Sequence, residues 1–110
     1  MSIVVNLRYT GVNGNAAKFA QEMEQSGTAD LIRAEDGNLR YEYYVSLEDP
    51  ETVLLIDAWK DQEAIDKHHA SEMMKTIADL RNKYDLHMEV NRYVEDEQGV
   101  SAKDQSFIRK

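Results

Sequence analysis

LRYEYYVS at residues 39–46 and VLLIDAW at residues 53–59 are the two stretches that decide the fold of this chain. The first stretch alternates between two sets of side chains, and the second is an almost continuous apolar run. Both patterns are typical of β-strands. The turn-forming pair Asp49-Pro50 lies between them. The sequence therefore predicts two strands that pair as one antiparallel hairpin.

Two further segments repeat this alternation. In residues 3–9, one face carries Ile3, Val5, Leu7 and Tyr9, and the other face carries Val4, Asn6 and Arg8. Residues 86–94 alternate in the same way, with Arg92 in the mainly apolar set and Tyr93 in the other. We therefore predict four strands in all.

The segments between these strands show the spacing of apolar residues that is typical of helices. Apolar residues recur at helical spacing after Asn15, which could act as an N-cap, and Gly27 offers a C-terminal stop. A second helix is expected after Asp61, with a break near Ala70 and a new start capped by Ser71. Residues 28–36 are expected to be a loop that can hold one helical turn.

The order strand, helix, strand, strand, helix, strand predicts an α+β domain with the ferredoxin-like split βαβ arrangement, in which helices cover one side of a four-stranded antiparallel sheet. Because both faces of the strands carry large apolar groups, the uncovered face also needs a partner. We expect that partner to be a second copy of the chain, which makes the protein a homodimer.

The domain is expected to span residues 1–95, followed by a polar C-terminal tail at residues 96–110. Phe107 and Ile108 are unusually apolar for such a tail, and we expect them to dock on the domain or on the partner protomer.

Composition excludes several classes of function. The 110 residues carry a formal net charge of -8, which argues against binding to nucleic acid or to an anionic membrane surface. The absence of cysteine removes disulfides, thiolate zinc sites and thiol nucleophiles. No basic leader or apolar run of membrane-spanning length is present, so we expect a cytoplasmic protein.

Several short motifs resemble one known family in order and spacing. They are Gly37-Asn38-Leu39-Arg40-Tyr41-Glu42-Tyr43-Tyr44, Asp49-Pro50, Asp57-Ala58-Trp59, Glu63-Ala64 and His68-His69-Ala70-Ser71. Together they resemble the antibiotic biosynthesis monooxygenase family over residues 3–94. The sequence departs from the common family pattern after Ser71, where Glu72 and Met73 replace a frequent proline and second histidine.

The resemblance implies a dimeric α/β barrel with a small-molecule pocket between the sheet and the helices of each protomer. It also implies either a quinol or polyketide monooxygenase that needs no metal or flavin, or an isomerase of a phosphorylated diketone sugar. The more distant haem-degrading relatives have a histidine on the last helix, whereas this chain has Thr76-Ile77-Ala78-Asp79 there. No cofactor and no metal ion are therefore expected.

His68 is the first candidate catalytic residue, because imidazole exchanges protons near neutral pH and the helix break could turn it into the pocket. The alternative is a surface or half-buried histidine without a role. His69 follows about 100° further round the helix, so the two do not readily share a target.

Asn6 is the second candidate, since the resemblance implies a catalytic asparagine on this strand and a buried amide needs partners. Arg8 points the same way and would suit an anionic or carbonyl oxygen. Asp57 is expected to form a structural hydrogen bond at an interface rather than to act on substrate. The remaining candidates are phenols that could line an aromatic pocket, namely Tyr41, Tyr43, Tyr44 and Tyr93.

Three hypotheses for the function follow. The first is a cofactor-independent monooxygenase that oxidises a small aromatic, quinol or polyketide-like substrate with dioxygen. The second is an isomerase of a small dicarbonyl metabolite, in which Asn6 or Arg8 stabilises the enediolate. The third is a non-catalytic dimer that binds a small molecule.

Overall fold

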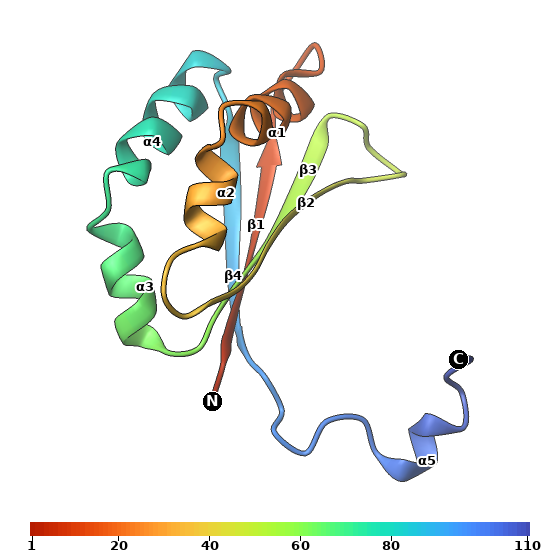
Figure 1. Ribbon diagram of the computed structural model, residues 1–110. Coiled ribbons are helices and arrows are strands. Elements are labelled where there is room, and N and C mark those ends of the chain that lie inside the picture. The colour runs from red at the N-terminus through yellow and green to blue at the C-terminus, as the bar shows by residue number, and fades with distance from the viewer.

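A computed structural model describes all 110 residues, and Figure 1 shows the arrangement of its helices and strands. The elements in chain order are β1 (Ile3–Thr10), α1 (Asn15–Gln25), α2 (Thr28–Arg33), β2 (Asn38–Val45), β3 (Thr52–Trp59), α3 (Gln62–His69), α4 (Met73–Lys83), β4 (His87–Val94) and α5 (Ala102–Gln105). The strands form one sheet in the order β2-β3-β1-β4, and every neighbouring pair is antiparallel. The ferredoxin-like α+β fold expected from the sequence is confirmed.

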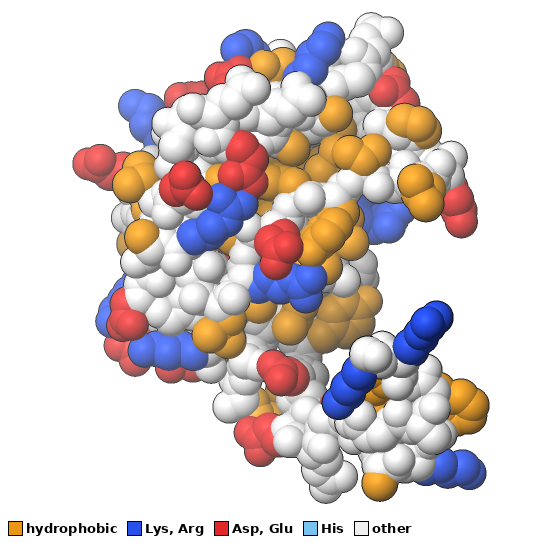
Figure 2. All heavy atoms as spheres, turned by 45° about the vertical axis from the view of Figure 1, so that its right-hand side comes forward, with side chains coloured by type: hydrophobic (Ala, Val, Ile, Leu, Met, Phe, Trp, Pro, Cys, Tyr) orange, Lys and Arg blue, Asp and Glu red, His pale blue; other side chains and the backbone are white.

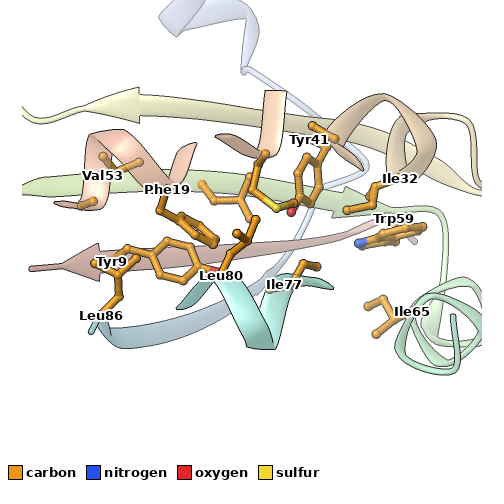
Figure 3. Packing of buried hydrophobic residues seen from close by; sticks show 14 of the residues in the cluster. Tyr9, Phe19, Ile32, Tyr41, Val53, Trp59, Ile65, Ile77, Leu80 and Leu86 are labelled. Carbon is orange, nitrogen blue, oxygen red and sulfur yellow. The ribbon is translucent and has the colours of Figure 1, made fainter. Parts of the chain in front are cut away.

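Helices α1 to α4 lie on one side of this sheet (Figure 1). The hydrophobic core fills the space between the two layers, and Figure 3 shows how its side chains meet. Tyr9 from the central strand β1 packs on Phe19 of α1, with ring centroids 4.9 Å apart. Trp59 closes the end of the core near α3 and is 1% exposed. The face of β1 that carries Ile3, Val5, Leu7 and Tyr9 is therefore the helix-covered face.

The opposite face of the sheet has no cover within the chain. Its central residues Val4, Leu54 and Ile56 are only half-buried, and Tyr44 and Tyr93 are 39% and 54% exposed. Figure 2 brings part of this side forward and shows hydrophobic side chains among charged ones. The sheet is not closed into a barrel by one chain, so the two-copy barrel stays a prediction.

The loop between α2 and β2 passes very close to α3, and Gly37 makes this possible. Gly37 has a φ of +88°, and a Cβ placed there would lie 2.6 Å from the Cβ of Ala64 on α3. A side chain at this position would meet both backbone strain and a steric clash. The carbonyl of Gly37 also accepts a hydrogen bond from the backbone N–H of Lys60 at 2.9 Å. The residues next to Gly37 are thereby held against α3.

Some local predictions differ from the structure. Residues 28–33 form the short helix α2, which buries Ala29 and Ile32, because tertiary packing outweighs the weak local signal. Asn15 is the first helical residue rather than the cap, and its amide donates to the carbonyl of Tyr84 at 3.2 Å. Ser71 does not cap α4, since its hydroxyl donates to the carbonyl of His68 at 2.6 Å.

The C-terminal segment leaves the domain on the side away from the helices (Figure 1). Phe107 is 85% exposed and Ile108 is 44% exposed, so neither side chain is buried against its own domain. Docking of this segment on a partner protomer stays a prediction. None of the helices combines the length and the apolar character needed to cross a membrane.

Candidate functional site

A cavity of about 360 Å³ lies between the sheet and helices α3 and α4. Its floor is formed by helix-facing residues of the strands, including Val5 and Leu7 of β1 and Val90 of β4. Ile65 and Ile77 from the two helices contribute apolar walls. The volume lies within the range of sites that enclose small molecules.

His68 lies at the wall of this cavity and is only 5% exposed. The helix face that buries Ala64 and Ile65 also carries His68, because His68 follows them by four and three positions. The imidazole stacks on the indole of Trp59 with ring centroids 4.7 Å apart and an interplanar angle of 29°. Packing on Trp59 therefore fixes the plane of the ring.

Glu35 anchors the other side of this imidazole. Its Oε2 lies 2.7 Å from Nδ1 of His68, and its side chain is 17% exposed. A carboxylate in this position accepts a hydrogen bond from Nδ1–H, which leaves Nε2 as the basic nitrogen of the neutral ring. Nε2 has no partner within the protein. The ring is thus held by one nitrogen, and the other is free to exchange a proton.

Burial lowers the pKa of His68, and the negative charge of Glu35 opposes part of that decrease. The net direction is downward, which favours the neutral ring at pH 7. A neutral imidazole oriented by a carboxylate is the form that acts as a general base.

Asp57 is the second titratable group of the cavity. It is 8% exposed, and its Oδ1 accepts a hydrogen bond from Nε1–H of Trp59 at 2.6 Å. Burial raises the pKa of Asp57 to about 7, against a smaller opposing effect of the bond from Trp59. The bond expected across an interface is instead formed with Trp59, two residues along the same strand.

Two arginines complete the polar lining. Arg92 of β4 occupies the same cross-strand row as Val5 and Asp57, and Arg81 of α4 donates from Nη1 to the sulfur of Met88 at 3.3 Å. Neither arginine forms an ion pair with a carboxylate.

The structure separates the sequence-predicted residues into two groups. His68 and Tyr41 line the cavity, and the Tyr41 hydroxyl lies 3.1 Å from that of Tyr43, which faces the same layer but packs on Phe19. The other four side chains lie on the opposite, uncovered face of the sheet: Asn6, Arg8, Tyr44 and Tyr93. The expectation that Asn6 reaches the pocket of His68 is therefore wrong within one chain.

The reason for this difference is the alternation of the strand. Residues 3–9 present two faces, and the helices cover the face with the larger apolar side chains. Asn6 belongs to the other set, and its Oδ1 is buried there without a hydrogen-bond partner. Tyr44 donates to Glu42 at 2.8 Å and accepts from Arg40 at 2.8 Å, which is a surface network.

His69 is exposed at the edge of the cavity, with its ring centroid 5.8 Å from that of His68. The chain contains no group of three or more His, Asp or Glu side chains arranged to hold a metal ion.

Sequence reasoning did not find Glu35, Arg81 and Arg92 as site residues. Glu35 lies in a loop, 33 positions before His68, where no periodic pattern marks it. Arg92 had a detectable signal, because it is the one charged residue in the apolar set of its strand.

Comparisons with known proteins agree with this architecture. The family model described as antibiotic biosynthesis monooxygenase matches residues 2–80. A solved structure from Deinococcus radiodurans, which bears the same family description, is 21% identical with a TM-score of 0.75, and the match covers 86% of this chain and 93% of that one. A conserved protein from Methanosarcina mazei is 26% identical with a TM-score of 0.72, over 87% of this chain and 94% of that one.

SnoaB from Streptomyces nogalater, described as a cofactor-independent oxygenase, is 16% identical with a TM-score of 0.73, and the match covers 87% of this chain and 94% of that one. No curated protein matches the sequence significantly. Because the family model covers well over half of the chain and the fold agrees throughout that range, the chain belongs to the antibiotic biosynthesis monooxygenase family.

Proposed function

We propose that this protein is a cofactor-independent monooxygenase, and that it oxidises a small aromatic, quinol or polyketide-like substrate with dioxygen in the cavity beside His68. The observation that carries the proposal is the buried His68, whose Nδ1 is held 2.7 Å from Glu35 while Nε2 has no protein partner. Family membership supports the general class of reaction.

The proposed reaction begins with proton transfer from the substrate to Nε2 of His68. A phenolic ring that carries an oxidisable CH₂ group becomes an electron-rich anion when it loses a proton. The anion passes one electron to dioxygen, and the resulting substrate radical and superoxide combine to form a carbon–oxygen bond. Protonation by the imidazolium and loss of water then leave a carbonyl group. One oxygen atom enters the product and the other leaves as water, so the substrate supplies all the electrons.

The protein contributes three things to this sequence. Glu35 orients the base and stabilises the imidazolium that forms after proton transfer. Apolar side chains such as Leu7 and Ile77 exclude water from the reactive anion. Tyr41 and Trp59 offer aromatic surface against which a planar ring can pack.

An isomerase is the second candidate, and Asp57 is the observation that favours it. Its pKa of about 7 lets Asp57 donate a proton at neutral pH in the same cavity as the base His68. Such a pair could move a proton between the carbons of a dicarbonyl substrate without consuming oxygen.

Oxygen uptake separates these possibilities. We expect the purified protein, treated with a chelator and free of flavin absorbance, to consume dioxygen with an anthrone substrate, which carries the required CH₂ group, at rates well above the uncatalysed background. The oxygen consumed should match the carbonyl product in a ratio of about one to one, as the balanced reaction requires. Turnover without oxygen uptake would favour the isomerase, and tight binding without turnover would favour a binding protein.

We also propose that the functional unit is a dimer in which the uncovered sheet faces of two copies meet. The apolar centre formed by Val4, Leu54 and Ile56 supports this arrangement, since no element of the chain covers it. Charges of both signs surround that centre on the same face, including Arg8 and Glu89. In a two-fold dimer, positive side chains of one copy can therefore lie against negative side chains of the other. A stable folded monomer in sedimentation at micromolar concentration would contradict the dimer.

A further inference from the structure

We infer that the substrate of this cavity carries an anionic group, of the carboxylate type, which Arg81 and Arg92 bind while the oxidisable part of the ring lies beside His68. The inference rests on the proposed function, because it takes this cavity as the site of that reaction. It adds a chemical class of substrate that neither the fold nor the family determines.

The first observation is the unusual charge of the cavity. The chain as a whole has 21 acidic and 13 basic residues, yet the cavity lining contains two arginines and a single carboxyl group, Asp57. The pKa of Asp57, about 7, leaves that group partly protonated at neutral pH. Two guanidinium groups therefore face the cavity with little negative charge to balance them.

The second observation is that these arginines have no competing partners. Arg33 and Arg40 elsewhere in the chain each form an ion pair with a glutamate, at Glu24 and Glu42 respectively. Arg81 and Arg92 form none, and the one hydrogen bond that their side chains make with the protein is that of Arg81 to the sulfur of Met88. A sulfur atom is a weak acceptor, so this contact leaves the donors of Arg81 available for a stronger one.

The third observation is the layout of the cavity floor. Asp57, Val5 and Arg92 form one cross-strand row, while Met88 belongs to the row of Tyr9, four residues further along the strand. Four residues of strand span about 13 Å, and two strand spacings span about 10 Å. The rows between carry apolar side chains such as Leu7 and Val90.

This layout fits a planar ligand with two different ends. Its apolar body would lie over Leu7 and Val90, within reach of the guanidinium groups on the β4 and α4 side. Its reactive edge would lie on the β3 and α3 side, where His68 and Asp57 are located. Carboxylates suit arginine because the planar guanidinium can donate two parallel hydrogen bonds.

The test compares two redox-inert ligands by titration calorimetry, 2-naphthoate and its methyl ester, which differ in charge but share the ring and lack the phenolic hydroxyl at which the proposed reaction begins. We expect the carboxylate to bind at least about tenfold more tightly than the ester, a difference of about 1.4 kcal/mol. Arg81→Gln and Arg92→Gln should each weaken carboxylate binding about tenfold and leave ester binding unchanged. Lys75→Gln, which removes an exposed cation from the same helix, is the matched control and should change neither.

Equal binding of the acid and the ester, binding of the acid that is insensitive to both arginine variants, or binding of neither ligand would overturn the inference. Because the ligands cannot be oxidised by this reaction, the result is independent of turnover. Arginine-dependent binding without any oxygen uptake on anthrones would support the anion site and contradict the monooxygenase. Oxygen uptake together with equal binding of the acid and the ester would support the monooxygenase and contradict the anion site.

Discussion

Asp57→Asn should stabilise the protein above neutral pH, although it removes a buried polar residue of the cavity. An aspartate has a pKa of about 3.9 in an unfolded chain, whereas burial raises that of Asp57 to about 7 in the fold. At a pH between these two pKa values, Asp57 keeps its proton in the folded state but has released it in the unfolded state. Stability therefore falls as pH rises from about 4 to about 7, and the cost stays constant above that range.

The size of the effect follows from the same shift. One pKa unit corresponds to about 1.4 kcal/mol, so a rise from 3.8 to about 7 amounts to about 4 kcal/mol as an upper value. Asparagine keeps an oxygen that can accept the hydrogen bond from Trp59 but carries no charge. We expect Asp57→Asn to be more stable than the wild type by about 2–4 kcal/mol at pH 8 and to show little difference near pH 4.

Urea unfolding followed by circular dichroism at pH 4, 6 and 8 measures this difference. Protein concentration must be equal in every sample, because the stability of a dimer depends on it. Asp79→Asn, which removes a charge from the exposed side of α4, is the control and should show no comparable rise with pH. If Asp57→Asn were less stable than the wild type at pH 8, the ionised carboxylate would be favourably paired in the fold, and this account of the cavity would be wrong.

Three further predictions concern Glu35, Gly37 and the tail. Glu35→Gln should lower kcat/KM by about tenfold to a hundredfold. The low-pH limb of its rate profile should also move to lower pH, because the charge of Glu35 raises the pKa of His68. An unchanged profile would show that Glu35 does not influence the base. Gly37→Ala should cost about 2 kcal/mol or more in urea unfolding, since strain and the clash with Ala64 act together. Gly99→Ala has positive φ but open space around it, so an equal loss there would show that the clash is unimportant. Deletion of residues 104–110 should lower the melting temperature by a few degrees if Phe107 and Ile108 pack on a second copy, whereas an unchanged value would mean that the tail contributes nothing.

The strands and their pairing could be predicted because their side chains alternate with a strict two-residue period. That period defines the two faces of β1 but does not state which face meets the helices. The helices cover the side of Tyr9, which packs on Phe19, and this choice depends on contacts between distant segments. The family resemblance implies a catalytic asparagine on this strand, but Asn6 lies on the other face.

The candidate site could be predicted only in part, for a related reason. His68 was identifiable because Ala64 and Ile65 mark the buried side of its helix. Glu35 was not, because its position depends on the close approach that Gly37 permits between a loop and α3. A contact between segments this far apart in the chain cannot be predicted from local sequence patterns.

Oxygen uptake by His68→Ala is the measurement that tests the central claim most directly, namely that His68 is the base of a monooxygenase. With an anthrone that the wild type oxidises, we expect the variant to be slower by about a hundredfold or more. Its fold and sedimentation should match those of the wild type. His87→Ala, which changes an exposed histidine of β4 on the opposite face of the sheet, should retain full activity. Undiminished oxygen uptake by His68→Ala would contradict the claim, because the proposed reaction cannot begin without that base.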